Sequence, residues 1–284
     1  MTLPAVDLDY DLSEDIVPGP WRRDSLFVFA RIEEAVREAV GPAPSLPPAG
    51  DGRRPTTPAQ LLDVACGTAD QAGRLGSAGW QSWGLEPSPA MLRLARLRRQ
   101  ERGQEVIFLR GIAERLPFAD SSLDCVVCQG SLDHFARPEE FMAEVARILK
   151  PEGRAVIALA NFESLSCRLG RLVHRFRRRF GIPEMPGRPY WQIPENHTFK
   201  GDADVLRRLA QPWLRLERMH GVSLLWLLRR WSLFLESLPE PAAWALLRSV
   251  DRLAYRVPSL SDTLISVWRP RKKALLGGQR LDNS

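Results

Sequence analysis

The segment LLDVACGTA at 61–69 joins an apolar run to a turn of small residues, and an acidic residue, Glu86, follows it. Ala65, Gly67 and Ala69 alternate along the turn and leave room for the backbone to approach a ligand closely. A glutamate carboxylate accepts hydrogen bonds from both hydroxyls of a ribose. This strand, turn and helix with a following acid predicts a site for an adenosine-containing cofactor at the carboxyl edge of a parallel sheet.

The dinucleotide-binding fingerprint G-x-G-x-x-G competes with this interpretation, and the segment taken alone leaves the choice open. Its spacing differs, because here an acid opens the motif as Asp63-x-Ala65-x-Gly67-x-Ala69. A carboxylate at the end of the first strand would repel a pyrophosphate and attract the ammonium group of an amino-acid moiety. The spacing therefore favours a cofactor with an ammonium group over a dinucleotide.

Four segments in order resemble the class I S-adenosylmethionine-dependent methyltransferases, in particular the group of quinone and small-molecule enzymes. They are LLDVACGTA, WGLEPS, GIAERLPFADSSLDCVVCQGSLDHF at 111–135 and RILKPEGRAVIALANF at 147–162. The resemblance covers residues 58–162 in register. It implies an enzyme that transfers a methyl group from S-adenosyl-L-methionine to a small-molecule or lipid-linked acceptor.

The resemblance also implies which residues bind the cofactor, all of them within the first three segments. They are Asp63, Ala65, Cys66, Gly67, Glu86, Pro87, Ile112, Ala113, Glu114, Gln129 and Gly130. Glu86 is expected to hold the ribose, and Ala113 and Glu114 to lie beside the adenine. Gln129 and Gly130 are expected to close the site.

Three positions depart from the family pattern. Ala69 and Glu152 each replace a glycine, which is a mild change, and Ile112 stands where the family commonly has an aspartate that contacts the adenine. The loss of that acceptor costs on the order of 1 to 3 kcal/mol if nothing replaces it. Packing of Ile112 against the adenine ring would recover part of this, so we expect cofactor binding to survive.

Transfer from a sulfonium requires alignment of nucleophile, methyl and sulfur, and a base where the nucleophile is a hydroxyl or an ammonium group. The sequence offers His134, directly after the fourth expected strand, as the general base, and Glu195 and His197 as alternatives. A histidine hydrogen-bonded to a neighbouring loop is the other interpretation of His134. No metal site is predicted, because Cys125 and Cys128 lie in one strand, where residues three apart point to opposite faces.

The elements that must position these residues follow from the periodicity of the apolar side chains. Strands are expected near 60–65, 80–86, 105–109, 124–129, 154–161, 213–219 and 261–270, with helices between most of them. Right-handed crossovers turn this alternation into an α/β, doubly wound, Rossmann-like sheet of seven strands. The sheet is expected to be mostly parallel, with the last strand antiparallel at its far side.

The remaining regions complete the expected domain organisation. It consists of a cap helix and proline-rich connector (1–57), the methyltransferase domain (58–270) with helical lid insertions (about 163–195 and 221–260), and a disordered tail (271–284). The cap helix is predicted at 24–40 from its apolar stripe, and it is expected to cover the active site.

The insertions carry the indications of the acceptor. Between Cys167 and Gly181 there are six arginines and no acid around an apolar helical stripe, and the run 224–238 is dense in Leu and Trp. These features favour either packing of a lid on the main domain, or peripheral contact with a membrane surface or a lipid-linked substrate. The net charge of +6 permits phosphate binding, but no nucleic-acid-binding module is recognisable, so methylation of RNA is a lower-ranked alternative.

Composition and cysteine usage set the broad class. With 44% apolar and 26% charged residues the chain fits an ordinary soluble protein, and its four cysteines without a secretory signal favour a cytoplasmic location. Two other functional classes stay open: a pseudoenzyme or interaction protein that binds the cofactor without turnover, and a nicotinamide-dependent oxidoreductase. The second lacks both the glycine fingerprint and a Tyr-x-x-x-Lys pair.

Overall fold

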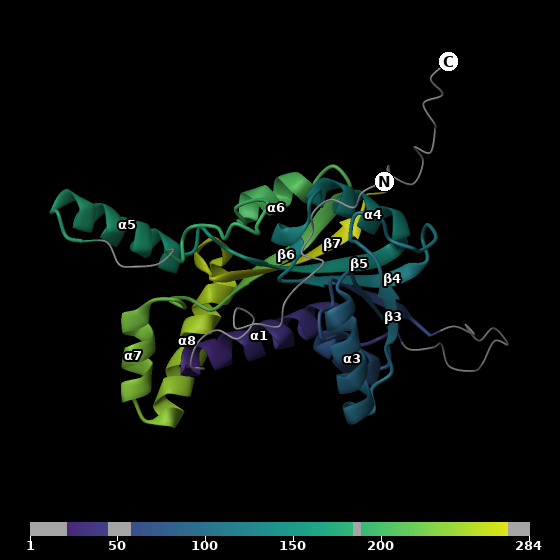
Figure 1. Ribbon diagram of the computed structural model, residues 1–284, viewed down its shortest axis with the longest axis horizontal. Helices are drawn as coiled ribbons and strands as arrows, with labels where there is room; N and C mark the ends of the chain where they lie inside the picture. Colours follow the sequence, from purple (N-terminus) through teal and green to yellow (C-terminus); the bar gives the residue numbers. More distant parts are fainter. Residues whose placement is uncertain (1–21, 45–57, 184–188, 272–284) are drawn as a thin grey trace, which may run out of the picture.

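Seven strands form one sheet in the part of the chain that the computed structural model describes, residues 22–44, 58–183 and 189–271. The strands are β1 (Gln60–Val64), β2 (Gln81–Glu86), β3 (Ile107–Arg110), β4 (Leu123–Gln129), β5 (Leu149–Ala160), β6 (Leu214–Val222) and β7 (Thr263–Pro270). Their order is β3-β2-β1-β4-β5-β7-β6, and helices cover both faces of the sheet (Figure 1). The expected doubly wound α/β sheet is confirmed. Its order reverses between β1 and β4, which is where open sheets of this kind bind ligands.

Strand β7 is antiparallel, as expected, but it does not lie at the edge of the sheet. It pairs with β5 on one side and with β6 on the other. All but one of the residues of β7 are buried, whereas β6 exposes Arg215, Glu217 and Arg218. An apolar strand gains most from an interior position, and charged side chains are tolerated at an edge. The last strand therefore lies on the far side of the sheet, as expected, but β6 is the edge strand beyond it.

Eight helices precede or connect the strands in the described part of the chain. They are α1 (Arg23–Val40), α2 (Asp70–Ser77), α3 (Pro89–Arg102), α4 (Pro138–Ile148), α5 (Leu165–Arg179), α6 (Ala203–Ala210), α7 (Arg229–Ser237) and α8 (Glu240–Arg256), with 3-10 turns η2 (Leu132–His134) and η3 (Pro258–Leu260). At the start of α3 the Ser88 hydroxyl accepts a hydrogen bond from the Met91 N–H, and Gly103 ends the helix in the left-handed conformation. These contacts satisfy backbone groups that lack a partner inside the helix.

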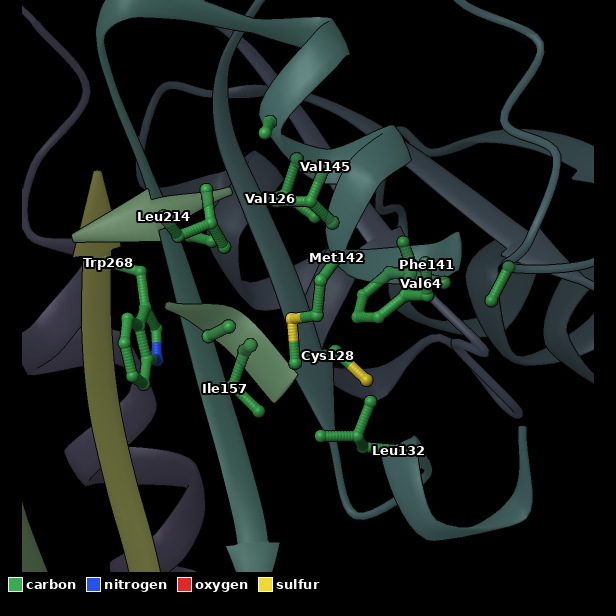
Figure 2. Close-up of a cluster of buried hydrophobic side chains, with 14 of the residues drawn as sticks. Val64, Val126, Cys128, Leu132, Phe141, Met142, Val145, Ile157, Leu214 and Trp268 are labelled. Atoms are coloured by element: carbon green, nitrogen blue, oxygen red, sulfur yellow. The ribbon is translucent and has the colours of Figure 1, made fainter. Parts of the chain in front are cut away.

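Two apolar cores lie on opposite faces of the sheet. On one face α4 packs on β4, and Figure 2 shows Met142 and Val145 of α4 near Val126 and Cys128 of β4. On the other face α1, α2 and α8 cover Cys125 and its neighbours. Cys125 and Cys128 are free thiols that point to opposite faces, as the period of a strand requires. The expected opposite directions of the two side chains are confirmed.

The helix expected at 24–40 is α1, but it covers the sheet instead of the site. Its side chains Val28, Ile32 and Val36 are buried, and the helix contacts β5 and β7. None of its residues lines the cavity described below. The expectation that this helix caps the active site is wrong, because its apolar stripe packs on a face of the sheet that β5 and β7 present.

The Leu- and Trp-rich run 224–238 does not form one helix. Leu225 and Leu227 have positive φ angles of 67° and 73°, so the helix, α7, begins only at Arg229. Trp226 and Trp231 pack against the core that α1 and α8 share with the sheet. Lid packing therefore accounts for the tryptophans of this run.

Several of the expected segments lie partly or wholly outside the described residues. The tail 272–284 and most of the cap and connector region, 1–21 and 45–57, lie outside them. The expected insertions contain α5 in the first case and α7 and α8 in the second. Among the described residues, no helix has the length and apolar character needed to span a bilayer.

Candidate active site

A cleft at the carboxyl ends of β1, β2 and β4 encloses about 870 Å³, its open mouth included. Nine of the residues expected at the site line it: Ala65, Gly67, Glu86, Pro87, Ile112, Ala113, Glu114, Gly130 and His134. Five lining residues were not foreseen: Leu85, Met91, Gly111, Ser131 and Phe135. Each of these five is within five residues of an expected one, so a wider window around the motifs could have found them.

Three expected residues are close to the cleft without lining it. Asp63 is buried at the end of β1, beneath the turn. The Cys66 sulfur faces β2, where a Cβ built on Gly84 would lie 2.8 Å from it. Gln129 ends β4 directly before Gly130, and its buried Oε1 atom has no hydrogen-bond partner among the described residues. A buried acceptor without a donor costs free energy, so Gln129 is suited to a donor that a ligand brings.

The turn after β1 is built for close approach of a ligand. Ala65, Gly67 and Ala69 all have left-handed backbone conformations, with φ angles of 54°, 52° and 58°. A Cβ added to Gly67 would meet no atom within 4 Å, and the same holds for Gly130 on the opposite wall. Since both residues line the cleft, a side chain at either position would occupy its empty space.

Glu86 is fixed to this turn by two backbone groups. Its carboxylate accepts the N–H of Gly67 at 2.9 Å and the N–H of Ser88 at 3.0 Å. Burial raises the pKa of Glu86, although these two hydrogen bonds work to lower it. A carboxylate held in this way at the wall of a cleft is preorganised to accept hydrogen bonds from paired hydroxyls.

Asp63 and Glu86 give the cleft a negative field. Burial, with the charge of Glu86 as a smaller contribution, raises the pKa of Asp63 to about 7, against a hydrogen bond from the backbone of Ala72. A cation bound nearby would favour the ionised carboxylates and lower their pKa values. The cleft is therefore suited to a positively charged ligand.

Apolar groups form the wall expected to hold the adenine. Ile112, Ala113, Leu85 and Met91 all line this part of the cleft. The Glu114 carboxylate accepts the backbone N–H of Arg137 at 3.2 Å, which ties this wall to the start of α4.

A cluster of acid and imidazole groups lies on the side of the cleft that follows β4. His134 lines the cleft from η2, and its ring contacts the ring of His197 edge to face, with 4.5 Å between centroids. His197 Nδ1 is 2.9 Å from the carboxylate of Asp133, which is almost fully buried. Thr198 holds the two segments together, because its N–H donates to the Asp133 carbonyl at 2.7 Å.

Asp133 stays ionised in this cluster. Burial works to raise its pKa, but the hydrogen bond from His197 and the charges of His197 and His134 outweigh it, so the pKa lies below its usual value. The ionised carboxylate places a negative charge beside both rings. Sequence patterns gave no sign of Asp133, and Glu195, the other alternative base, is exposed and does not line the cleft.

Comparison with known proteins is consistent with this geometry. Residues 62–157 match the family described as "Methyltransferase domain". A demethylmenaquinone methyltransferase of Thermus thermophilus is 38% identical over 102 residues, which cover 35% of this chain and 46% of the relative. A demethylmenaquinone methyltransferase of Renibacterium salmoninarum is 32% identical over 149 residues, which cover 52% of this chain and 53% of the relative. The chain thus spans about half the length of the curated relatives it matches.

A solved structure extends the similarity of fold beyond the matched segment. It is described as an S-adenosylmethionine-dependent methyltransferase, possible histamine N-methyltransferase, from Thermotoga maritima. Its TM-score is 0.50 at 18% identity, with 86% of this chain and 89% of that chain covered. At this identity the likeness concerns the fold alone.

Proposed function

This chain belongs, through residues 62–157, to the class I S-adenosylmethionine-dependent methyltransferases, and we propose that it transfers a methyl group to a small-molecule or lipid-linked acceptor by in-line displacement. The observation that carries the proposal is Glu86, held by the N–H groups of Gly67 and Ser88 at the wall of the cleft. The negative field of Asp63 and Glu86 supports a cationic ligand there in place of a pyrophosphate.

The cofactor is S-adenosyl-L-methionine, and the residues of the cleft fit it. The open space at Gly67 and Gly130 leaves room for it, and the unpartnered Oε1 atom of Gln129 supports an ammonium donor on that side. When bound, the cofactor supplies a methyl group on a sulfonium leaving group. Glu86 would hold the ribose, while Ile112 and Ala113 would pack on the adenine.

We propose that His134 acts as general base where the acceptor must lose a proton. It is the imidazole that lines the cleft, and the neighbouring Asp133 carboxylate would stabilise the imidazolium that forms. His197 would orient this group through its contacts with both residues. The rest of the rate acceleration would come from alignment of acceptor and methyl group in the cleft.

Hydrophobic acceptors are supported by the names of the relatives. Two are demethylmenaquinone methyltransferases, and another, from Maricaulis maris, is a ubiquinone biosynthesis O-methyltransferase. Such acceptors partition into membranes, so peripheral contact of a cytoplasmic enzyme with the membrane surface belongs to this proposal. The test is methylation of a short-chain demethylmenaquinol, followed by mass spectrometry. A mass increase other than one methyl group would contradict methyl transfer.

A cofactor-binding pseudoenzyme is the second candidate, and Ile112 is the observation that favours it. The two are separated by turnover: a pseudoenzyme would be stabilised thermally by S-adenosylhomocysteine yet methylate no acceptor. A ligand at 100 times its Kd stabilises a protein by about 2.7 kcal/mol, so the same measurement with NAD as competitor tests the oxidoreductase alternative.

Ile112→Asp is expected to tighten cofactor binding by up to about tenfold, because it restores an acceptor for the adenine amino group. Isothermal titration calorimetry with S-adenosylhomocysteine measures the effect. Ile112→Asn is the matched control, since it adds an acceptor without adding a charge to the carboxylates nearby. Unchanged affinity for both variants would mean that the adenine does not lie against Ile112.

The affinity for S-adenosylmethionine is expected to rise severalfold between about pH 6 and 8. The pKa of Asp63 is about 7 in the folded protein and about 3.9 in an unfolded chain. Between these two pH values the folded protein keeps a proton on Asp63 that the unfolded chain has released. The contribution of Asp63 to the free energy of unfolding is therefore lost as pH rises through 7. Above pH 7 the ionised carboxylate attracts the cationic cofactor more strongly. Titrations of the wild type and Asp63→Asn across this range check it, and a flat wild-type profile would contradict it.

A further inference from the structure

Helix α5 exposes an apolar stripe that the proposed reaction does not use. Leu172, Val173, Phe176 and Phe180 are 59%, 55%, 58% and 64% exposed. Single exposed apolar residues are common on protein surfaces, but a contiguous group of large apolar side chains indicates an interaction site. The outer half of α5 therefore presents an apolar surface to solvent.

The same helix carries a dense positive charge. The segment 165–182 contains six arginines and no acid. With about 100° between successive residues, Arg175 lies beside the apolar stripe, about 100° from Phe176, and Arg171 and Arg178 lie farther round the helix. Within the described residues, no ion pair joins Arg175 or Arg178 to a carboxylate. Their charges are thus available to an outside partner.

The inner end of α5 is fixed to the body of the protein. Ser164 caps the helix by accepting the N–H of Cys167 at 3.3 Å, and the Tyr190 hydroxyl donates to the Ser166 carbonyl at 3.0 Å. Trp191 packs so closely on Gly170 that a Cβ there would lie 2.4 Å from the ring. The helix is therefore held in position although its outer half makes few contacts.

The inner end of α5 lies at the carboxyl ends of the strands, where the cleft opens. Strand β5 is parallel to β4 and ends at Ala160, shortly before α5 begins. Figure 1 shows α5 projecting from the body of the molecule beyond these strand ends. A surface bound by α5 would consequently lie near the carboxyl ends of the strands, on the side of the cleft.

We propose that residues 171–182, the outer half of α5 and the turn that follows it, bind the surface of an anionic lipid bilayer. Phe176 and Phe180 would enter the boundary between headgroups and acyl chains, while the arginines contact lipid phosphates. The helix is too short and too charged to cross the membrane, so it lies in the surface plane. The inference rests on the proposed function, because it assigns the peripheral membrane contact to α5 and would bring the cleft to hydrophobic acceptors, but the binding itself requires no methyl transfer.

Charge and apolar character together favour lipid over other partners. A nucleic acid would neutralise the arginines but leave Phe176 and Phe180 in water. A second copy of α5 would cover the apolar stripe but bring two sets of six arginines together, which repel each other. An anionic bilayer offers acyl chains to the apolar stripe and phosphates to the arginines that flank it.

Co-sedimentation with vesicles tests the proposal, using the full chain. Vesicles of phosphatidylcholine with phosphatidylglycerol are expected to bind the protein at low salt and less at high salt, and pure phosphatidylcholine vesicles are expected to bind it weakly. Arg175→Gln/Arg178→Gln should lower the partition coefficient by about 30-fold, at roughly fivefold per charge. Leu172→Ser/Phe176→Ser should lower it at both salt concentrations.

Helix α3 offers matched controls at residues that do not line the cleft. Leu97 is 57% exposed, close to the value for Leu172, and Arg93 and Arg96 are exposed on the same helix. Leu97→Ser and Arg93→Gln/Arg96→Gln are therefore expected to bind vesicles as the wild type does. All of these changes are on exposed side chains, and circular dichroism confirms that each variant is folded.

Three results would overturn the proposal. The first is equal binding of the α5 variants and the wild type to anionic vesicles. The second is absence of binding to anionic vesicles at low salt with tight binding to RNA. The third is a dimer in sedimentation velocity that Leu172→Ser/Phe176→Ser dissociates, with no vesicle binding by the wild type. Cofactor titration of the same variants is expected to be unchanged, so failure here is separate from failure of the proposed reaction.

Discussion

Gly67→Val is expected to abolish binding of S-adenosylmethionine while the protein still folds. A side chain at Gly67 meets no protein atom within 4 Å, so the isopropyl group would project into the cleft and occupy space that the ligand needs. It would also strain the left-handed turn whose N–H group holds the carboxylate of Glu86. Titration calorimetry with S-adenosylhomocysteine and with the cofactor itself measures the loss.

Gly103→Val separates the loss of the site from the strain of the substitution. Gly103 ends α3 with a φ of 61°, close to the 52° of Gly67, and a Cβ there also meets nothing within 4 Å. Both variants should lose stability by a similar amount, on the order of 1 to 2 kcal/mol for a side chain in this conformation. Only Gly67→Val should lose the ligand. Unchanged affinity of folded Gly67→Val would mean that the cofactor site has been misplaced.

His134→Ala is expected to lower turnover by about 10²- to 10⁴-fold, the usual contribution of a positioned general base. Cofactor affinity should stay nearly unchanged, because the proposed ribose and adenine contacts come from other residues. The wild-type rate should rise between about pH 6 and 7, where imidazoles lose their proton. Initial rates with a short-chain demethylmenaquinol across a pH series measure both effects.

The alternative to a general base is purely positional catalysis, in which the acceptor loses its proton to water. His134→Ala would then cost less than about tenfold, and the pH profile would follow the ionisation of the acceptor. His174→Ala is the control, because His174 lies on α5 beside Trp191 and does not line the cleft. A larger loss in His197→Ala than in His134→Ala would identify His197 as the base instead.

Local patterns were enough to predict most of the residues that line the cleft. The turn from Asp63 to Ala69 and the position of Glu86 depend on the next strand and helix along the chain, so their residue types and spacing carry most of the information. The opposite directions of Cys125 and Cys128 follow in the same way from the period of a strand. The sequence by itself thus determined the alternation of strands and helices and the motif that follows β1.

Long-range competition for burial decided what the sequence left open. Periodicity identified α1 and β7 as apolar elements, but only the assembled sheet places α1 on the face of β5 and β7, and β7 between β5 and β6. The cluster beside η2 is of the same kind, because His197 meets His134 and Asp133 only after the two helices and the strand between them in the sequence have packed. Such contacts join residues about 60 positions apart. The free energy that selects them comes from packing whole faces of helices against the sheet, and a local sequence pattern does not contain this information.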